Sequence, residues 1–161
     1  MVITGANGDI AREIARRVKG YKLILMSRDI SDLSGVSDYL YQVDLSDEAA
    51  LVAACKQISA KFGSIDILIN NAGYGEFREF LAYRSDEIRK LFEVNVFALM
   101  TVTRAFLPDM IHEKTGNSVA NNLAMLSCQG RFNSLLFVSR LATIFLATKP
   151  ALTACLPTFA K

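Results

Sequence analysis

The sequence has no tryptophan, a single histidine, and only three cysteines and three prolines. The cysteines are odd in number and none is spaced as C-x-x-C, so the sequence signals neither a disulfide framework nor a zinc site. Reduced thiols and a cytoplasmic location are therefore expected. The one histidine, His112, stands at a polar helix end, which argues against a metal site or a histidine-dependent catalytic triad.

The sequence also lacks a strong excess of positive or negative charge, and it lacks long apolar runs. The 18 basic and 16 acidic side chains are mixed along the chain and give a net charge of +2, so no basic stripe predicts nucleic acid as a partner. The apolar segment 135–145 contains Arg140 and is shorter than the roughly 18 residues of a spanning helix. The first residues, MVITGANGDIAREIARR, lack the apolar stretch of a signal peptide. No membrane span or membrane partner is expected.

What the sequence does contain is an alternation of strand and helix patterns within one domain-sized chain of 161 residues. Apolar runs at 2–4, 23–26, 39–43 and 65–69 have the character of strands that are covered on both faces. Between them, Ile10, Ile14 and Val18 recur at helical spacing, and Ser46 is the predicted N-cap of a second helix that Gly63 ends. The predicted fold is α/β, a doubly wound parallel sheet in three α/β/α layers.

A long helix is predicted after Ser85, its expected N-cap. Its apolar stripe comprises Ile88, Leu91, Phe92, Leu99, Val102 and Phe106. Pro108, Gly116 and Asn117 are expected at or beyond its end. The segment SVANNLAMLS that comes next has no clear run of β-branched residues, so a fifth strand is not indicated and the C-terminal strands of the sheet are expected to be missing.

The stretch TGANGDIA, residues 4–11, joins the first strand to the first helix. Gly5, Gly8 and Ala11 fall at the spacing G-x-x-G-x-x-A, which is typical of a turn that presents backbone N–H groups and a helix N-terminus to a pyrophosphate. A plain tight turn is the alternative. The P-loop pattern G-x-x-x-x-G-K-[ST] is absent, which argues against a nucleoside triphosphate site.

The end of the second strand bears on which dinucleotide would bind. An acidic residue about 20 residues after the glycines commonly bonds the adenosine ribose, but Ser27 and Arg28 occupy that place. A guanidinium there suits a 2′-phosphate, so NADP(H) is favoured over NAD(H) as the cofactor. The alternative is that Arg28 is a solvated loop arginine.

These motifs, together with SR after the second strand, DLS at 44–46, NNAG at 70–73 and EVNV at 93–96, resemble the short-chain dehydrogenase/reductase family. The resemblance covers residues 1–117 and implies an NAD(P)-binding core with a Rossmann-like fold, followed by a divergent tail, 118–161, of the same domain. It implies that the cofactor is bound by Gly5, Asn7, Gly8, Asp9, Ile10, Arg28, Asp44, Leu45, Asn71, Ala72 and Gly73. Asp9 stands where a glycine is common, and its carboxylate is expected to face solvent.

Asn95 lies within the apolar stripe of the long helix, where an unpaired amide would cost about 1–3 kcal/mol. The resemblance implies that Asn95 belongs to the catalytic group, at a local distortion of the helix, with an ordered water linked to the catalytic lysine. The alternative is an asparagine that a neighbouring carbonyl satisfies and that has no chemical role.

The family's catalytic tyrosine with a lysine four residues later has no counterpart here, since no Tyr-x-x-x-Lys occurs. The segment FLATKPAL, 145–152, is similar to the family's YxATKxAL, with Phe145 in the tyrosine's place and Lys149 retained. Ser127 is the candidate for the family's serine. No metal site is predicted.

Two interpretations stay open. The chain is an NADP(H)-dependent oxidoreductase that moves a hydride between nicotinamide and an alcohol or carbonyl substrate, or it is a non-catalytic NAD(P)-binding domain or fragment. The tail belongs either to a degenerate or truncated member, or to a reading frame that changes near residue 117. In the family the long helix commonly builds a dimer interface, so a homodimer through residues 85–112 is expected, with a monomer as the alternative.

Overall fold

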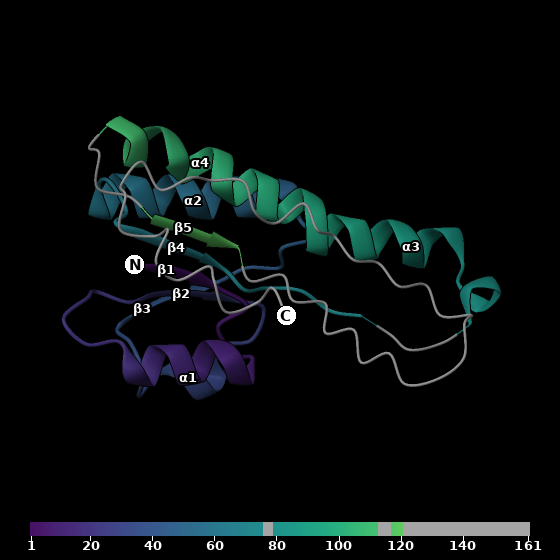
Figure 1. Ribbon diagram of the computed structural model, residues 1–161, viewed down its shortest axis with the longest axis horizontal. Coiled ribbons are helices and arrows are strands. Elements are labelled where there is room, and N and C mark those ends of the chain that lie inside the picture. The colour runs from purple at the N-terminus through teal and green to yellow at the C-terminus, as the bar shows by residue number, and fades with distance from the viewer. Residues whose placement is uncertain (76–78, 113–116, 121–161) are drawn as a thin grey trace, which may run out of the picture.

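The computed structural model describes residues 1–75, 79–112 and 117–120, which form a parallel sheet with helices on both faces (Figure 1). The sheet has the order β3-β2-β1-β4-β5, and each neighbouring pair is parallel. The strands are β1 (Val2–Thr4), β2 (Ile24–Ser27), β3 (Tyr39–Gln42), β4 (Ile67–Asn70) and β5 (Asn117–Ala120). The chain extends the sheet from β1 to one side and then crosses to β4, so the direction of winding reverses between β1 and β4.

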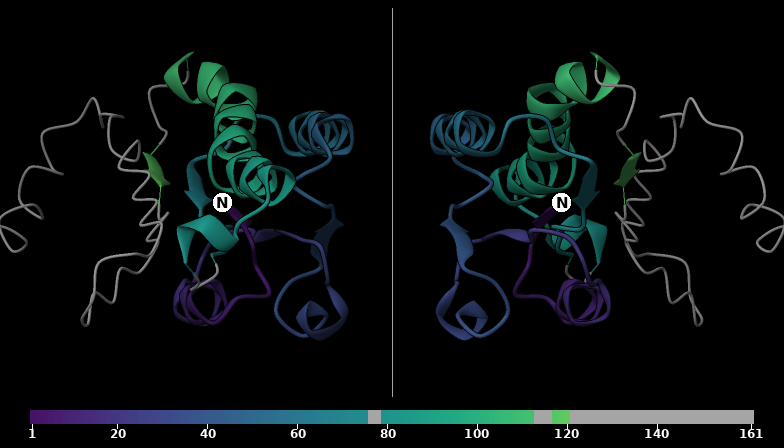
Figure 2. Two further views of the ribbon diagram at one scale, coloured as in Figure 1. Left: turned by 90° about the vertical axis from the view of Figure 1, so that its right-hand side faces the viewer. Right: turned by 90° about the vertical axis from the view of Figure 1, so that its left-hand side faces the viewer.

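Helix α1 (Asp9–Arg17) covers one face, and α2 (Glu48–Phe62) and α4 (Ala98–His112) cover the other, as the end-on views in Figure 2 show. Alternate residues of β1 supply the two cores. Val2 packs in the cluster with α2 and α4, whereas Ile3 packs in the cluster with α1. Both side chains are fully buried, which confirms the predicted three-layer α/β/α architecture.

The apolar stripe predicted for the first helix is confirmed only in part. Ala11 and Ala15 are the buried residues of α1, and Ile10 is 48% exposed. The glycine turn sets the start of the helix close to the sheet, so that methyl side chains fit against the strands and larger ones lie to the side. Ile14 and Val18 are only partly buried against this core.

Two predicted helix caps are also wrong by one residue. Asp47 is the N-cap of α2, where its carboxylate accepts a hydrogen bond of 3.0 Å from the N–H of Ala50. Ser46 instead donates to Asp44. Helix α3 (Ser85–Phe92) has Arg84 as its N-cap, and the N–H of Arg84 donates to Oε2 of Glu87 at 2.8 Å.

The predicted long helix is continuous but not uniform, because a π-helical turn, η3 (Glu93–Phe97), separates α3 from α4. A π turn adds a residue and so rotates the rest of the helix about its axis. The buried stripe of α4 is accordingly Ala98, Val102, Phe106 and Met110, whereas Leu99 is only half-buried. The helix runs to His112, so Pro108 lies inside it and not at its end.

Strand β5 is present despite the absence of a β-branched run. Its backbone pairs with β4 over four residues, from Asn117 opposite Ile67 to Ala120 opposite Asn70. Pairing with a buried neighbour overrides weak local propensity. The strand extends three residues beyond the expected core boundary at 117.

By length and composition alone, Ser85–His112 satisfies the requirements for a membrane-spanning helix, with a mean hydropathy of 1.3 in its most apolar window. Core helices of globular proteins satisfy the same test. Its α4 part packs against α2 and β4, but only 17% of the window is buried. The outer face of this helix therefore carries apolar side chains that the described parts of the fold do not cover.

Candidate functional site

The carboxyl ends of β1 to β4 border a cleft of about 680 Å³ at the point where the winding reverses. Ligands of open α/β sheets bind at such points, and the volume lies within the usual range for cofactor sites, about 300–1,000 Å³. The cleft brings together eight of the residues predicted to bind cofactor: Gly5, Gly8, Arg28, Asp44, Leu45, Asn71, Ala72 and Gly73. Their role in binding stays a prediction.

The turn after β1 requires glycine at Gly5 for two reasons. Its φ is +63°, which L side chains rarely adopt, and a Cβ built there would lie 2.7 Å from the Cα of Ala72. The N–H of Gly8 donates to the carbonyl of Gly5 at 3.0 Å, and Gly8 is the N-cap of α1. The backbone thus turns directly from the strand into a helix N-terminus that borders the cleft.

Hydrogen bonds join this turn to the loop after β4. The Nδ2 of Asn71 donates to the carbonyls of Thr4 and Gly5, each at 3.2 Å. The N–H groups of Asn71 and Ala72 both donate to Oγ1 of Thr4 at 3.1 Å. Thr4 is buried and was not predicted as a site residue. The hydroxyl at the end of an apolar strand is the feature of the sequence that could have identified it.

An ionised carboxylate and two cations line the other end of the cleft. The N–H and Oγ of Ser46 donate to Oδ1 of Asp44 at 2.9 and 2.8 Å, and these bonds hold the pKa of Asp44 below its usual value. The charges of Arg28 and Lys90 lower it further. The carbonyl of Arg28 accepts from Nε2 of Gln42 at 3.2 Å, which fixes the backbone of the arginine beside β3. Nothing in the sequence pattern pointed to Lys90.

Asn95 lies in the π-helical turn, which is the helix distortion that the family resemblance implies. Its Oδ1 accepts from the N–H of Tyr74 at 2.9 Å, and its Nδ2 donates to the carbonyl of Tyr74 at 2.7 Å. The amide is half-buried and not enclosed in the apolar stripe, because the π turn rotates it out of that stripe. Pairing with a backbone carbonyl is the contact that the non-chemical alternative requires, so a catalytic role stays a prediction. Tyr74, which lines the cleft, was missed.

The remaining predicted residues lie elsewhere. Asp9 and Ile10 are exposed and do not line the cleft, and Asn7 is held by Arg12. Ser127 and Lys149, together with Phe145, lie outside the described residues.

Neither metal chemistry nor a reactive thiol is indicated in the parts that the structure describes. Those parts hold no group of three or more His, Cys, Asp or Glu side chains that could bind a metal. Cys55 is buried, and burial raises the pKa of its thiol to about 11, so it is not a nucleophile.

The family model for short chain dehydrogenases matches residues 1–135. The chain belongs to this family. The match extends 18 residues beyond the boundary predicted at 117. Together with the similar solved structures, it identifies the parallel sheet as Rossmann-like. The relatives that the chain matches are named as dehydrogenases or oxidoreductases, and one of the similar structures holds NADP.

Individual family members are similar over most of this chain but extend further. A dehydrogenase/reductase SDR family member 7B from Mus musculus is 34% identical over 155 residues, which cover 83% of this chain and 45% of the mouse protein. A metagenomic short-chain oxidoreductase solved with NADP is 33% identical with a TM-score of 0.70, over 74% of this chain and 59% of that one. A 4-hydroxyisoleucine dehydrogenase complexed with NADH and succinate is 27% identical with a TM-score of 0.67, over 74% and 56%. The chain spans about half the length of the curated relatives it matches.

Proposed function

We propose that the chain binds NADP(H) in the cleft between β1 and β4, as the cofactor-binding part of a short-chain oxidoreductase that acts on a small alcohol or carbonyl. The observation that carries the proposal is that hydrogen bonds of Thr4 and Asn71 join the glycine turn to the loop after β4, beside the N-terminus of α1. A cytoplasmic location without a nucleic-acid or membrane partner belongs to the same proposal.

The residues present fit a dinucleotide phosphate. A Cβ at Gly5 would clash with Ala72, so the turn after β1 and the loop after β4 pack closely together beside the N-terminus of α1, where a pyrophosphate would bind. At the end of β2, where a carboxylate would favour the ribose hydroxyl of NAD, Arg28 lines the cleft. A guanidinium pairs with a 2′-phosphate, which supports NADP(H) over NAD(H). Bound nicotinamide would supply the hydride chemistry.

A second candidate function, cofactor binding without turnover, is favoured by one specific observation. The sequence has no Tyr-x-x-x-Lys, and Phe145 stands where the family's proton-donating tyrosine is found. A phenyl ring has no proton to give to a developing alkoxide. We therefore infer that this chain by itself holds NADP(H) but does not reduce carbonyl compounds.

Fluorescence titration of the whole chain with NADPH and NADH tests the proposal, followed by a reductase assay with simple aldehydes and ketones. We expect NADPH to bind more tightly than NADH, and Arg28→Ala to weaken NADPH binding about tenfold, the loss of one charge-assisted contact. Arg89→Ala, which removes an exposed arginine of α3 outside the cleft, is the control and leaves binding unchanged. Turnover would favour the enzyme over the binding domain, and a chain that binds neither nucleotide would refute both.

A further inference from the structure

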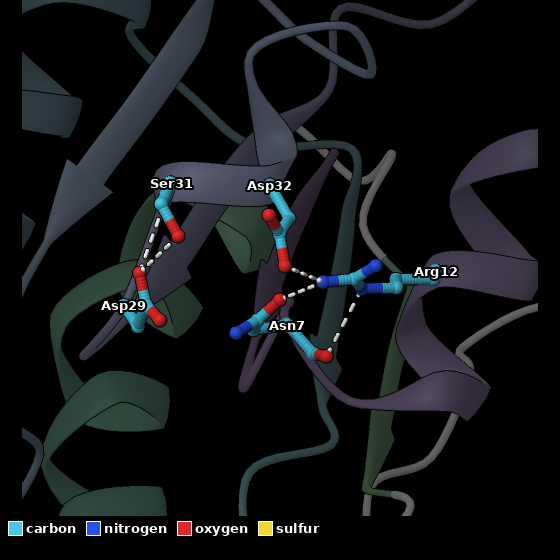
Figure 3. A network of polar contacts seen from close by, with 5 residues as sticks. All are labelled: Asn7, Arg12, Asp29, Ser31 and Asp32. Atoms are coloured by element: carbon cyan, nitrogen blue, oxygen red, sulfur yellow. Dashed lines mark hydrogen bonds and ion pairs between the residues drawn. The ribbon is translucent and has the colours of Figure 1, made fainter.

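Arg12 of α1 holds two segments that border the cofactor cleft (Figure 3). Its Nε donates to the carbonyl of Asn7 at 3.1 Å, and one of its terminal nitrogens also contacts Oδ1 of Asn7. The same nitrogen forms an ion pair of 3.1 Å with Oδ2 of Asp32. Asn7 belongs to the glycine turn, whereas Asp32 belongs to the 3-10 helix η1 (Ser31–Leu33) that comes after β2. One guanidinium thus joins the two loops.

The segment after β2 is held on its inner side by apolar packing, in which Ile30 and Val36 contact the same core cluster as α1. Leu33 is fully buried in the same core cluster as Ala11 and Ala15 of α1. At the start of the segment, Gln42 holds the carbonyl of Arg28. Between them, Asp29 forms a tight turn by accepting from the N–H and Oγ of Ser31 at 2.9 and 2.8 Å. The surface side of this segment is held to α1 by Arg12.

The charges around Arg28 depend on Arg12. Asp29 comes directly after Arg28; the two hydrogen bonds from Ser31 hold the pKa of Asp29 below its usual value, and the positive charge of Arg12 lowers it further. Two arginines, 12 and 28, therefore balance two aspartates, 29 and 32, in this small region. Without Arg12 the balance would be one negative charge, which disfavours an approaching phosphate.

Arg12 also differs from the other arginines of its helix. Its side chain is 28% exposed, whereas that of Arg16 is 69% exposed and lies 3.9 Å from Glu13 of the same helix. Such an exposed pair within a helix contributes little. Arg12 instead contacts two segments outside its helix, the glycine turn and η1, so its loss would affect the structure beyond α1.

We propose that Arg12 is a positioning residue that sets the preference for NADP(H) over NAD(H), because it holds the segment after β2 beside the glycine turn and neutralises the carboxylates beside Arg28. The inference rests on the proposed function, since it assigns a determinant of specificity to that same cleft. Arg12 does not line the cleft, so it acts through the placement and charge of the residues that do.

The test compares Arg12→Ala, Arg12→Lys and the control Arg16→Ala in the whole 161-residue chain. Dissociation constants for NADPH and NADH are measured by fluorescence titration at low and high salt. We expect Arg12→Ala to weaken NADPH binding about tenfold and NADH binding at most about twofold, with the difference shrinking at high salt. Arg12→Lys keeps the charge and recovers most of the preference for NADPH, while Arg16→Ala matches the unsubstituted chain.

A second readout needs no nucleotide. Hydrogen exchange of the amides of Gly8 and Leu33, which lie in the two joined segments, is expected to accelerate together in Arg12→Ala and not in Arg16→Ala. If Arg12→Ala does not fold, Asp32→Asn tests the charge balance by removing a negative charge in place of a positive one. This variant is expected to bind NADPH more tightly. Equal losses for both nucleotides, or no loss, overturn the inference while the proposed function stands. A chain that binds neither nucleotide overturns both.

Discussion

At the scale of single residues, the site depends on positions where the surrounding backbone requires a particular kind of residue. Gly5 combines a positive φ with a close approach to Ala72, and Thr4 offers its hydroxyl to two N–H groups of the loop after β4. Gly20 shares the positive φ but has nothing within 4 Å of an added Cβ. The two glycines therefore allow backbone strain to be separated from steric contact.

Gly5→Ala is expected to lower the free energy of unfolding by about 2–4 kcal/mol, because the methyl group adds a clash to the strain of a positive φ. Gly20→Ala carries the strain alone and is expected to cost about 1–2 kcal/mol. Urea unfolding followed by circular dichroism measures both. Equal losses for the two variants would show that the contact with Ala72 is relieved by a small shift of the loop.

At the scale of elements, the π-helical turn Glu93–Phe97 changes which side chains of the long helix face the core and which face the loop after β4. A uniform helix with the predicted stripe would bury Asn95 between apolar residues. The additional residue of the π turn rotates the helix instead, so that Asn95 pairs with both polar groups of Tyr74, a residue of the loop that lines the cleft. The turn thereby ties the long helix to the same loop that Asn71 ties to β1.

Asn95→Ala is expected to destabilise the chain by about 1–3 kcal/mol, since two hydrogen bonds to the backbone of Tyr74 are lost. Asn95→Asp keeps the acceptor for the N–H of Tyr74 but places a second oxygen against its carbonyl, so a loss of similar size is expected at neutral pH. Urea unfolding gives the loss, and hydrogen exchange at the amide of Tyr74 reports where it occurs. Unchanged exchange at that amide would mean that the loop is held by other contacts.

Among the elements, some were predictable from the sequence and others were not. The strands β1 to β4 were predictable because apolar runs bounded by turn residues identify buried parallel strands, and the glycine turn was predictable from its spacing. The exposure of Ile10 in α1 was not, because the short distance between helix and sheet leaves room for the methyl group of Ala11 and places the larger side chain to the side. The π turn and β5 depend on contacts distant in sequence, namely those of Asn95 with Tyr74 and of β5 with β4. Local patterns contain neither, whereas the family resemblance implied the distortion of the helix at Asn95.

At the scale of the whole molecule, the sheet is covered on both faces, but the long helix keeps an apolar outer side. Phe97, Met100 and Ile111 are exposed and recur at helical spacing on the side of the helix away from its buried stripe. Exposed Arg104 lies between Met100 and Ile111 on the same side, so the row combines apolar side chains with one charge, as surfaces for association commonly do. A second copy of the chain, packed through residues 85–112, would cover it.

Met100→Glu is therefore expected to convert a dimer into a monomer, because the row would then bury a carboxylate against an apolar partner. Sedimentation velocity over a range of protein concentrations measures the change. Leu81→Glu is the matched control, since Leu81 is 92% exposed and lies outside the helix in η2 (Phe80–Ala82), and it is expected to leave the dimer intact. If the unsubstituted chain sediments as a monomer at every concentration, the second copy is not the partner of this face.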